Sequence, residues 1–141
     1  MTGKTHLVGG FAASLVLCHN YEQGLLLVLG SLLCDIDHPN SIIGKCVPFL
    51  PKMLKHRGIT HSLLFSVLCY LISPYLCYGV LVHLFLDMLT KNGIKLLWPV
   101  DFSFRLPLAR YVKTGGKFEN LLFFMLWLGI LYFLTEKYLV I

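Results

Sequence analysis

The hydrophobic residues of this chain are gathered into five stretches, separated by short turns or by longer loops. The stretches cover residues 6–18, 22–35, 60–73, 75–90 and 119–135. Their lengths suit helices, but a helix needs ~20 residues to cross the hydrocarbon core of a membrane, and the first two stretches are shorter than that. We therefore expect these two to form a helical hairpin that need not span the membrane fully.

Turn and cap signals set the expected boundaries of the helices. Residues 19–22 turn the first hairpin, and Pro74 interrupts the pattern between the third and fourth stretches, which predicts a second, tighter hairpin. Pro39 favours an extended conformation at the residue before it, so the second helix should end near Asp35. Thr60 is a suitable N-cap for the third helix. These signals predict four to five helices.

The composition indicates that these helices lie in a membrane. Hydrophobic residues make up 57% of the 141-residue chain, charged residues make up 13%, and the mean hydropathy is +0.74. An ordinary soluble domain is less apolar than this. We expect one domain over residues 1–141. The predicted fold class is all-α: an integral membrane helical bundle of four to five apolar helices.

The net charge of +5 falls on one side of this bundle. Of the 12 lysines and arginines, only Lys137 lies outside the segments that an alternating topology places beside the N-terminus, among them loops 36–60 and 91–118. Basic loops stay in the cytoplasm, so we expect a cytoplasmic N-terminus. The expected partners are membrane lipids, with anionic headgroups at the basic loops, and not nucleic acid. A homo-oligomer is compatible with this composition.

The remaining ionisable residues gather on that same side. All histidines except His19, together with three aspartates, lie at the corresponding ends of the apolar stretches. They are His6, Asp35, Asp37, His38, His56, His61, His83 and Asp87. Ionisable groups at membrane depth are costly and usually mark function. The sequence therefore predicts a polar site on the cytoplasmic side.

Each motif of this set has a functional and a structural interpretation. His83 and Asp87 are four residues apart and share one helical face; they either bind a ligand or form a structural hydrogen bond. Asp35, Asp37 and His38 repel one another unless a cation holds them, and the alternative is a solvated acidic loop.

The basic loop before the third helix also has two interpretations. His56 and His61 are five residues apart and cannot share a helical face, so His56 is expected in the loop and His61 at the helix entry. Arg57 and that helix N-terminus would form an anion site. The alternative is an ordinary basic loop.

Mixed imidazole and carboxylate ligands predict a divalent metal, with zinc favoured and manganese or iron as alternatives. The five cysteines form no CxxC pair, which disfavours a thiolate zinc site, and most are expected to be buried as small hydrophobic residues. More than four candidate ligands leave room for two ions, an arrangement common in phosphoester hydrolysis.

The runs LGSLLCDIDHPNSIIG, HRGITHSLL and HLFLDMLTKNGIKLLWP resemble the YdjM-type family of bacterial inner-membrane proteins, which are described as metal-dependent hydrolases. The resemblance extends from His6 to about Glu119. It implies a multi-pass protein of the bacterial inner (plasma) membrane whose polar site contains the residues named above and Arg57. One departure is Cys34, where the family usually has proline. A more distant likeness, in ligand types and HxxxD spacing, is to zinc-dependent phospholipase C and related nucleases.

The resulting hypothesis is a membrane-bound metal-dependent hydrolase of a phosphoester or lipid-linked substrate. Asp37 is expected to orient or deprotonate the attacking water, Arg57 to bind phosphate, and His56 to join them in catalysis. The predicted metal ligands are His6, Asp35, His38, His61, His83 and Asp87. The alternatives are a membrane metal-ion or proton transporter or sensor, which the apolar opposite face does not favour, and a scaffold with a structural metal.

Overall fold

Two helical hairpins pack against each other and a long sixth helix follows them. The computed structural model describes residues 1–139; Val140 and Ile141, the end of the predicted domain, lie outside the described residues. The helices are α1 (Gly3–Leu17), α2 (Tyr21–Leu33), η1 (Cys34–Asp37), α3 (Leu50–Met53), η2 (Ile59–His61), α4 (Leu63–Ile72), α5 (Pro74–Met88), η3 (Pro107–Tyr111) and α6 (Lys117–Leu139). The described residues contain no named strand. The prediction of an all-α fold is confirmed.

Local sequence explains both hairpins. In the first, the side chain of Asn20 accepts a hydrogen bond from Gln23 N and caps α2. In the second, Pro74 occupies the first turn of α5, where its missing N–H costs nothing. The N-cap of α4 is Ser62, whose hydroxyl accepts from Phe65 N. The expectation that Thr60 caps this helix is wrong, since Thr60 lies in η2 and its hydroxyl points to Asp37.

The hairpins meet where α2 crosses α5, and two glycines allow the close approach. A Cβ atom on Gly79 would lie 2.0 Å from Leu27 O, and one on Gly30 would lie 2.2 Å from Leu76 O. Both obstacles are backbone atoms, so only glycine fits without moving a helix. The crossing brings Ser31 of α2 within hydrogen-bond distance of His83 of α5.

A buried hydrophobic core joins η1, α4, α5 and the loop that follows α5. The core contains Cys34, Cys69, Cys77, Val80, Leu84 and Ile94, all buried. The expectation that most cysteines are buried small residues is confirmed for three of them, whereas Cys18 is half-buried and Cys46 is exposed. Ile94 comes from loop 91–118, which returns to the core through an antiparallel bridge between Ile94 and Phe104.

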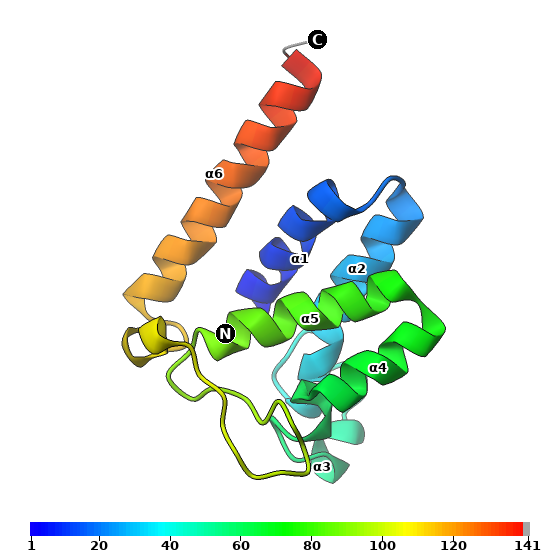
Figure 1. Cartoon of the computed structure of the whole chain (residues 1–141), viewed down its shortest axis with the longest axis vertical. Coiled ribbons are helices and arrows are strands. Elements are labelled where there is room, and N and C mark those ends of the chain that lie inside the picture. Colours follow the sequence, from blue (N-terminus) through cyan, green and yellow to red (C-terminus); the bar gives the residue numbers. More distant parts are fainter. Residues whose placement is uncertain (140–141) are drawn as a thin grey trace.

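Helix α6 differs from the others in length and surroundings. It packs against α1 of the first hairpin and extends beyond it towards the C-terminus (Figure 1). Buried Glu119 joins its first turn to α1, because Glu119 Oε1 accepts hydrogen bonds from Thr2 N, Thr2 Oγ1 and Thr5 Oγ1. Residues 117–137 are long and apolar enough to cross a membrane, whereas α4 and α5 are shorter apolar helices. The bundle of four to five membrane helices stays a prediction.

Candidate metal centre

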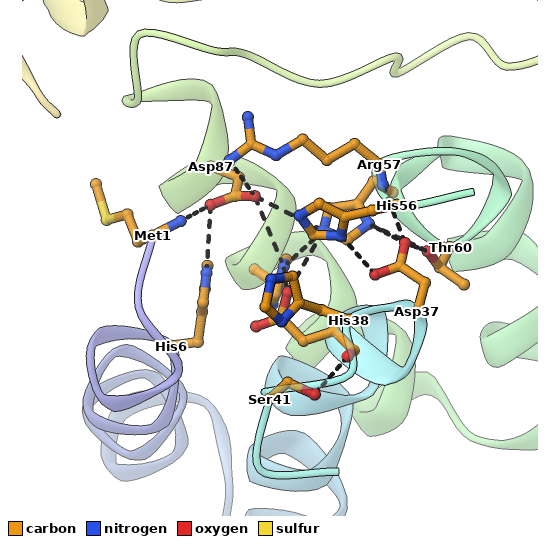
Figure 2. A network of polar contacts seen from close by, with 12 residues as sticks. Met1, His6, Asp37, His38, Ser41, His56, Arg57, Thr60 and Asp87 are labelled. Carbon is orange, nitrogen blue, oxygen red and sulfur yellow. Dashed lines mark hydrogen bonds and ion pairs between the residues drawn. The ribbon is translucent and has the colours of Figure 1, made fainter. Parts of the chain in front are cut away.

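Four helix ends that are distant in the sequence bring the predicted residues together. His6 comes from the start of α1, Asp35 and Asp37 from η1 after α2, His61 from η2 before α4, and His83 and Asp87 from the end of α5. All six side chains are buried. In Figure 2, Met1 and His6 approach Asp87 from one side, and Asp37, His56 and Thr60 lie together on the other. The convergence predicted from the apolar pattern is therefore present.

The centre of the cluster is a pair of imidazoles whose Nε2 atoms are 3.2 Å apart, those of His61 and His83. His83 Nδ1 lies 2.7 Å from Ser31 O, and because a carbonyl only accepts, Nδ1 carries the proton. His61 Nδ1 lies 3.1 Å from Thr60 Oγ1, which itself donates to Asp37. In neutral rings both Nε2 atoms therefore carry lone pairs that face each other. A proton or a cation between them removes this repulsion.

Two carboxylates complete the set around these nitrogens. Asp35 Oδ1 lies 3.7 Å from His61 Nε2 and 3.8 Å from His83 Nε2. Asp87 Oδ2 lies 3.6 Å and 4.0 Å from the same two atoms. Ligands of tetrahedral zinc, at roughly 2.0–2.2 Å from the ion, are about 3.3–3.6 Å apart. The four distances between these carboxylate oxygens and the imidazole nitrogens are close to this ligand–ligand spacing. Asp87 already pairs with the N-terminal amine and with Arg57. A proton would satisfy the imidazole pair alone, whereas a metal ion would also pair with Asp35.

His6 is the second indication that a ligand belongs here. Its side chain is fully buried and its ring stacks on that of His83, with the centroids 3.6 Å apart. His6 Nε2 lies 3.3 Å from Asp87 Oδ1, but the geometry does not make a hydrogen bond, and neither ring nitrogen has a hydrogen-bond partner among the described residues. A buried imidazole without a partner is costly, so a metal bound between His6, His83 and Asp87 would satisfy it.

Asp37 contacts His56 directly and is linked to His61 through Thr60. Its Oδ1 is 2.7 Å from His56 Nδ1, and its Oδ2 accepts from Thr60 Oγ1 at 2.6 Å and from Arg57 N at 3.0 Å. Burial alone would raise the pKa of this carboxyl, but hydrogen bonds from His56, His61 and Thr60 lower it well below its usual value. Asp37 is therefore an anion that orients its neighbours. Thr60 is the member of this network that sequence reasoning assigned to a different role.

Arg57 is fixed by three contacts and by an unusual backbone conformation. Its φ angle is 61°, in the left-handed region, which non-glycine residues adopt at a cost and which concentrates at functional sites. Besides the bond from its backbone N–H to Asp37, Nη1 donates to Gly93 O at 2.8 Å and Nη2 lies 3.4 Å from Asp87 Oδ2. The guanidinium is thus held beside the carboxylate cluster.

His38 and His56 lie at the edge of the cluster. Their rings pack edge to face, 4.9 Å apart, and the His56 side chain is 41% exposed. His38 Nδ1 accepts a hydrogen bond from Asn40 N at 3.2 Å, which leaves the proton of a neutral ring on Nε2. The structure places His38 outside both groups of residues whose atoms could share an ion. Its predicted role as a ligand stays a prediction, as do the other residue roles.

Those two groups adjoin each other and contain every other predicted histidine and aspartate. One consists of Asp35, Asp37, His56 and His61, and the other of His6, His83 and Asp87; within each, the potential ligand atoms lie within 4.8 Å of one another. A cavity of about 440 Å³ reaches this cluster and has Asp35, His38, His56, Arg57 and Asp87 in its wall. The residues fit one or two divalent ions that a small molecule could approach.

The described residues form an all-helical protein. One of its helices is apolar and long enough to cross a membrane, and a buried His–Asp cluster could hold metal. The chain belongs to the YdjM inner membrane protein family, whose model matches residues 1–138. It is 39% identical to YvsG of Bacillus subtilis (strain 168), with 94% of each chain covered. It is 37% identical to the inner membrane protein YdjM of Escherichia coli (strain K12) and to that of Shigella flexneri, covering 85% of this chain and 76% of each relative. No solved structure matches it significantly.

Proposed function

We propose that this protein is a membrane-bound, metal-dependent hydrolase that acts on a phosphoester or lipid-linked substrate at the cytoplasmic face of the bacterial inner membrane. The observation that carries this proposal is the pair of facing Nε2 atoms of His61 and His83, flanked by Asp35 and Asp87 at the end of a cavity. Zinc fits the donor set best, and manganese and iron are the alternatives. The family and the two adjacent ligand groups support a site for one or two ions.

The orientation in the membrane follows from charge and helix length. The N-terminal end of α1 and the basic loops share one side with the cluster, which the positive-inside rule assigns to the cytoplasm. Helices α1 and α2 contain 15 and 13 residues, or about 22 and 20 Å at 1.5 Å per residue, less than the ~30 Å hydrocarbon core. In this arrangement the cluster lies near the cytoplasmic headgroups, where the basic loops contact anionic lipids.

The chain's own residues suggest how a phosphoester would be handled. A bound divalent ion would act as a Lewis acid and lower the pKa of a coordinated water. Arg57, at the cavity wall and fixed by Asp87 and Gly93, is placed to pair with a phosphate oxygen. His56 lines the same cavity with its Nδ1 on Asp37, so its other nitrogen is available for proton transfer. Asp37 then acts by positioning His56 and His61.

Metal content is the first test. The protein, purified in detergent without chelator, should retain zinc, and His83→Ala and Asp35→Ala should each lose most of it. His19→Ala is the matched control, because His19 is exposed at the opposite end of the first hairpin. Unchanged metal in both cluster variants would reject the site. Circular dichroism checks that the variants remain folded.

Turnover of bis(p-nitrophenyl) phosphate and of phospholipids by the zinc-loaded protein is the second test. Hydrolysis lost in His83→Ala and kept in His19→Ala is the expected result. If the protein binds zinc and cleaves no phosphoester, and removing zinc unfolds it, the cluster is a structural metal site in a scaffold.

A further inference from the structure

Three pockets lie next to one another at the end of the protein that contains the His–Asp cluster. Neighbouring pockets share lining residues. The first is the cavity over the His–Asp cluster described above. The second, of about 290 Å³, shares His56, Arg57 and Asn92 with it. The third, of about 450 Å³, shares Met1 with it. The cluster cavity therefore adjoins both of the other pockets.

The pocket beyond Arg57 is basic. Its wall contains Lys55, Arg57 and Lys95 against a single carboxylate, that of Asp101, which pairs with Lys95. Asn92 and Trp98 add an amide and an indole to this wall. Three cations against one anion favour a negatively charged group. Because Arg57 lies between this pocket and the cluster, a group bound here would be the neighbour of a phosphoryl group at the cluster.

The pocket beyond Met1 has the opposite chemistry. It is lined by Met1, Leu89, Tyr111, Val112, Phe118 and Leu122, which come from η3, α6 and the segments beside α1, α5 and η3. Phe118 and Leu122 belong to α6, the helix with the length and composition to cross a membrane. A pocket with one wall on such a helix can be entered directly from the hydrocarbon layer. An apolar lining of this kind suits a hydrocarbon chain.

From this order we propose that the ligand of the site is a lipid diphosphate: a hydrocarbon chain in the apolar pocket, the chain-side phosphoryl group at the His–Asp cluster, and the second phosphate in the basic pocket. A lipid monophosphate would leave the basic pocket empty, and an inorganic diphosphate would leave the apolar pocket empty. The inference rests on the proposed function for the role of the cluster and adds the substrate class and its direction of binding.

Binding of non-hydrolysable ligands tests the arrangement separately from turnover. The ligands are methylenediphosphonate carrying a farnesyl chain, farnesylphosphonate, and methylenediphosphonate alone. Isothermal titration calorimetry on zinc-loaded protein in zwitterionic nanodiscs, with empty nanodiscs subtracted, should show the first binding at least about tenfold more tightly than either of the others. Metal analysis after each titration confirms that zinc has stayed on the protein.

Variants assign each part of the ligand to its pocket. Lys55→Ala and Lys95→Ala should each lower the affinity for the farnesyl diphosphonate at least about fivefold. The affinity for farnesylphosphonate should stay within about twofold of the wild-type value. Val112→Phe and Leu122→Trp place larger side chains in the apolar pocket. Each should lower the affinity for both farnesyl ligands at least about fivefold and leave the affinity for methylenediphosphonate unchanged. The controls are Lys52→Ala and Leu121→Trp, which are exposed and outside all three pockets.

The outcomes separate the two proposals. The proposal of a lipid diphosphate ligand is overturned if ligands with and without the chain bind equally well. It is also overturned if all variants bind the ligands as the wild type does. A preference for the farnesyl diphosphonate over farnesylphosphonate that the lysine variants leave intact overturns it as well. If the binding pattern holds but farnesyl diphosphate is not cleaved, the pocket order stands and the proposed hydrolysis fails.

Discussion

The α2–α5 crossing is the point at which a single methyl group should disturb both stability and the proposed metal centre. In Gly79→Ala the new Cβ would lie 2.0 Å from Leu27 O, 2.7 Å from Ser31 N and 2.8 Å from Gly30 Cα. All three are backbone atoms, so no side chain can rotate away. Reaching an ordinary 3.4 Å contact with Leu27 O requires the helices to move apart by about 1.4 Å.

That displacement also acts on the site. The bond from His83 Nδ1 to Ser31 O spans the same interface, and the same movement along it would lengthen 2.7 Å to about 4 Å, beyond hydrogen-bond range. Overpacking of a close interface costs about 1–3 kcal/mol. Losing the hydrogen bond that orients a metal-binding imidazole typically lowers metal affinity about 10- to 100-fold. Gly79→Ala should therefore lower both thermal stability and zinc affinity.

The measurement is the apparent melting temperature in detergent together with zinc affinity from competition with a chelator. We expect a decrease of roughly 3–10 °C. Gly129→Ala in α6 is the matched control, because a Cβ there has no neighbour within 4 Å, and replacing a helical glycine with alanine gains up to about 1 kcal/mol. If Gly79→Ala melts and binds zinc as Gly129→Ala does, the close crossing does not support the centre and the reasoning is refuted.

Three further substitutions test single contacts. Asp37→Asn should lower zinc affinity about 10- to 100-fold, because the anion that orients His61 through Thr60 is lost, and chelator competition measures it; unchanged affinity would remove Asp37 from the site. Glu119→Gln should cost about 1–3 kcal/mol in stability, seen as a lower melting temperature, because a buried acceptor of four hydrogen bonds is impaired; exposed Glu136→Gln is the control, and equal melting would contradict this. Arg57→Lys should lower phosphoester turnover at least about tenfold with zinc retained, because lysine cannot reproduce the guanidinium fork; full turnover would exclude Arg57 from phosphate binding.

Much of the local structure could be predicted from residue types alone. Proline at position 74 and the polar turn at residues 19–22 predicted the two hairpins, and both are present. Pro39 predicted the extended conformation observed at His38, with φ −113° and ψ 120°. The chosen cap of α4 was wrong because Thr60 and Ser62 are both good caps. A sequence does not show that Asp37, 23 residues away, accepts the hydrogen bond of Thr60.

The sequence by itself determined the helices, their apolar character, and the side of the bundle on which histidines and aspartates gather, because these depend on the spacing of residue types along one chain. Only the tertiary structure decided which of those groups meet. The close α2–α5 crossing sets the tautomer of His83 through Ser31, and the left-handed backbone at residue 57 aims the guanidinium at Asp87. The packing of α1 buries His6 with no hydrogen-bond partner among the described residues. Each of these depends on contacts between residues far apart in the chain, which periodicity and composition do not encode.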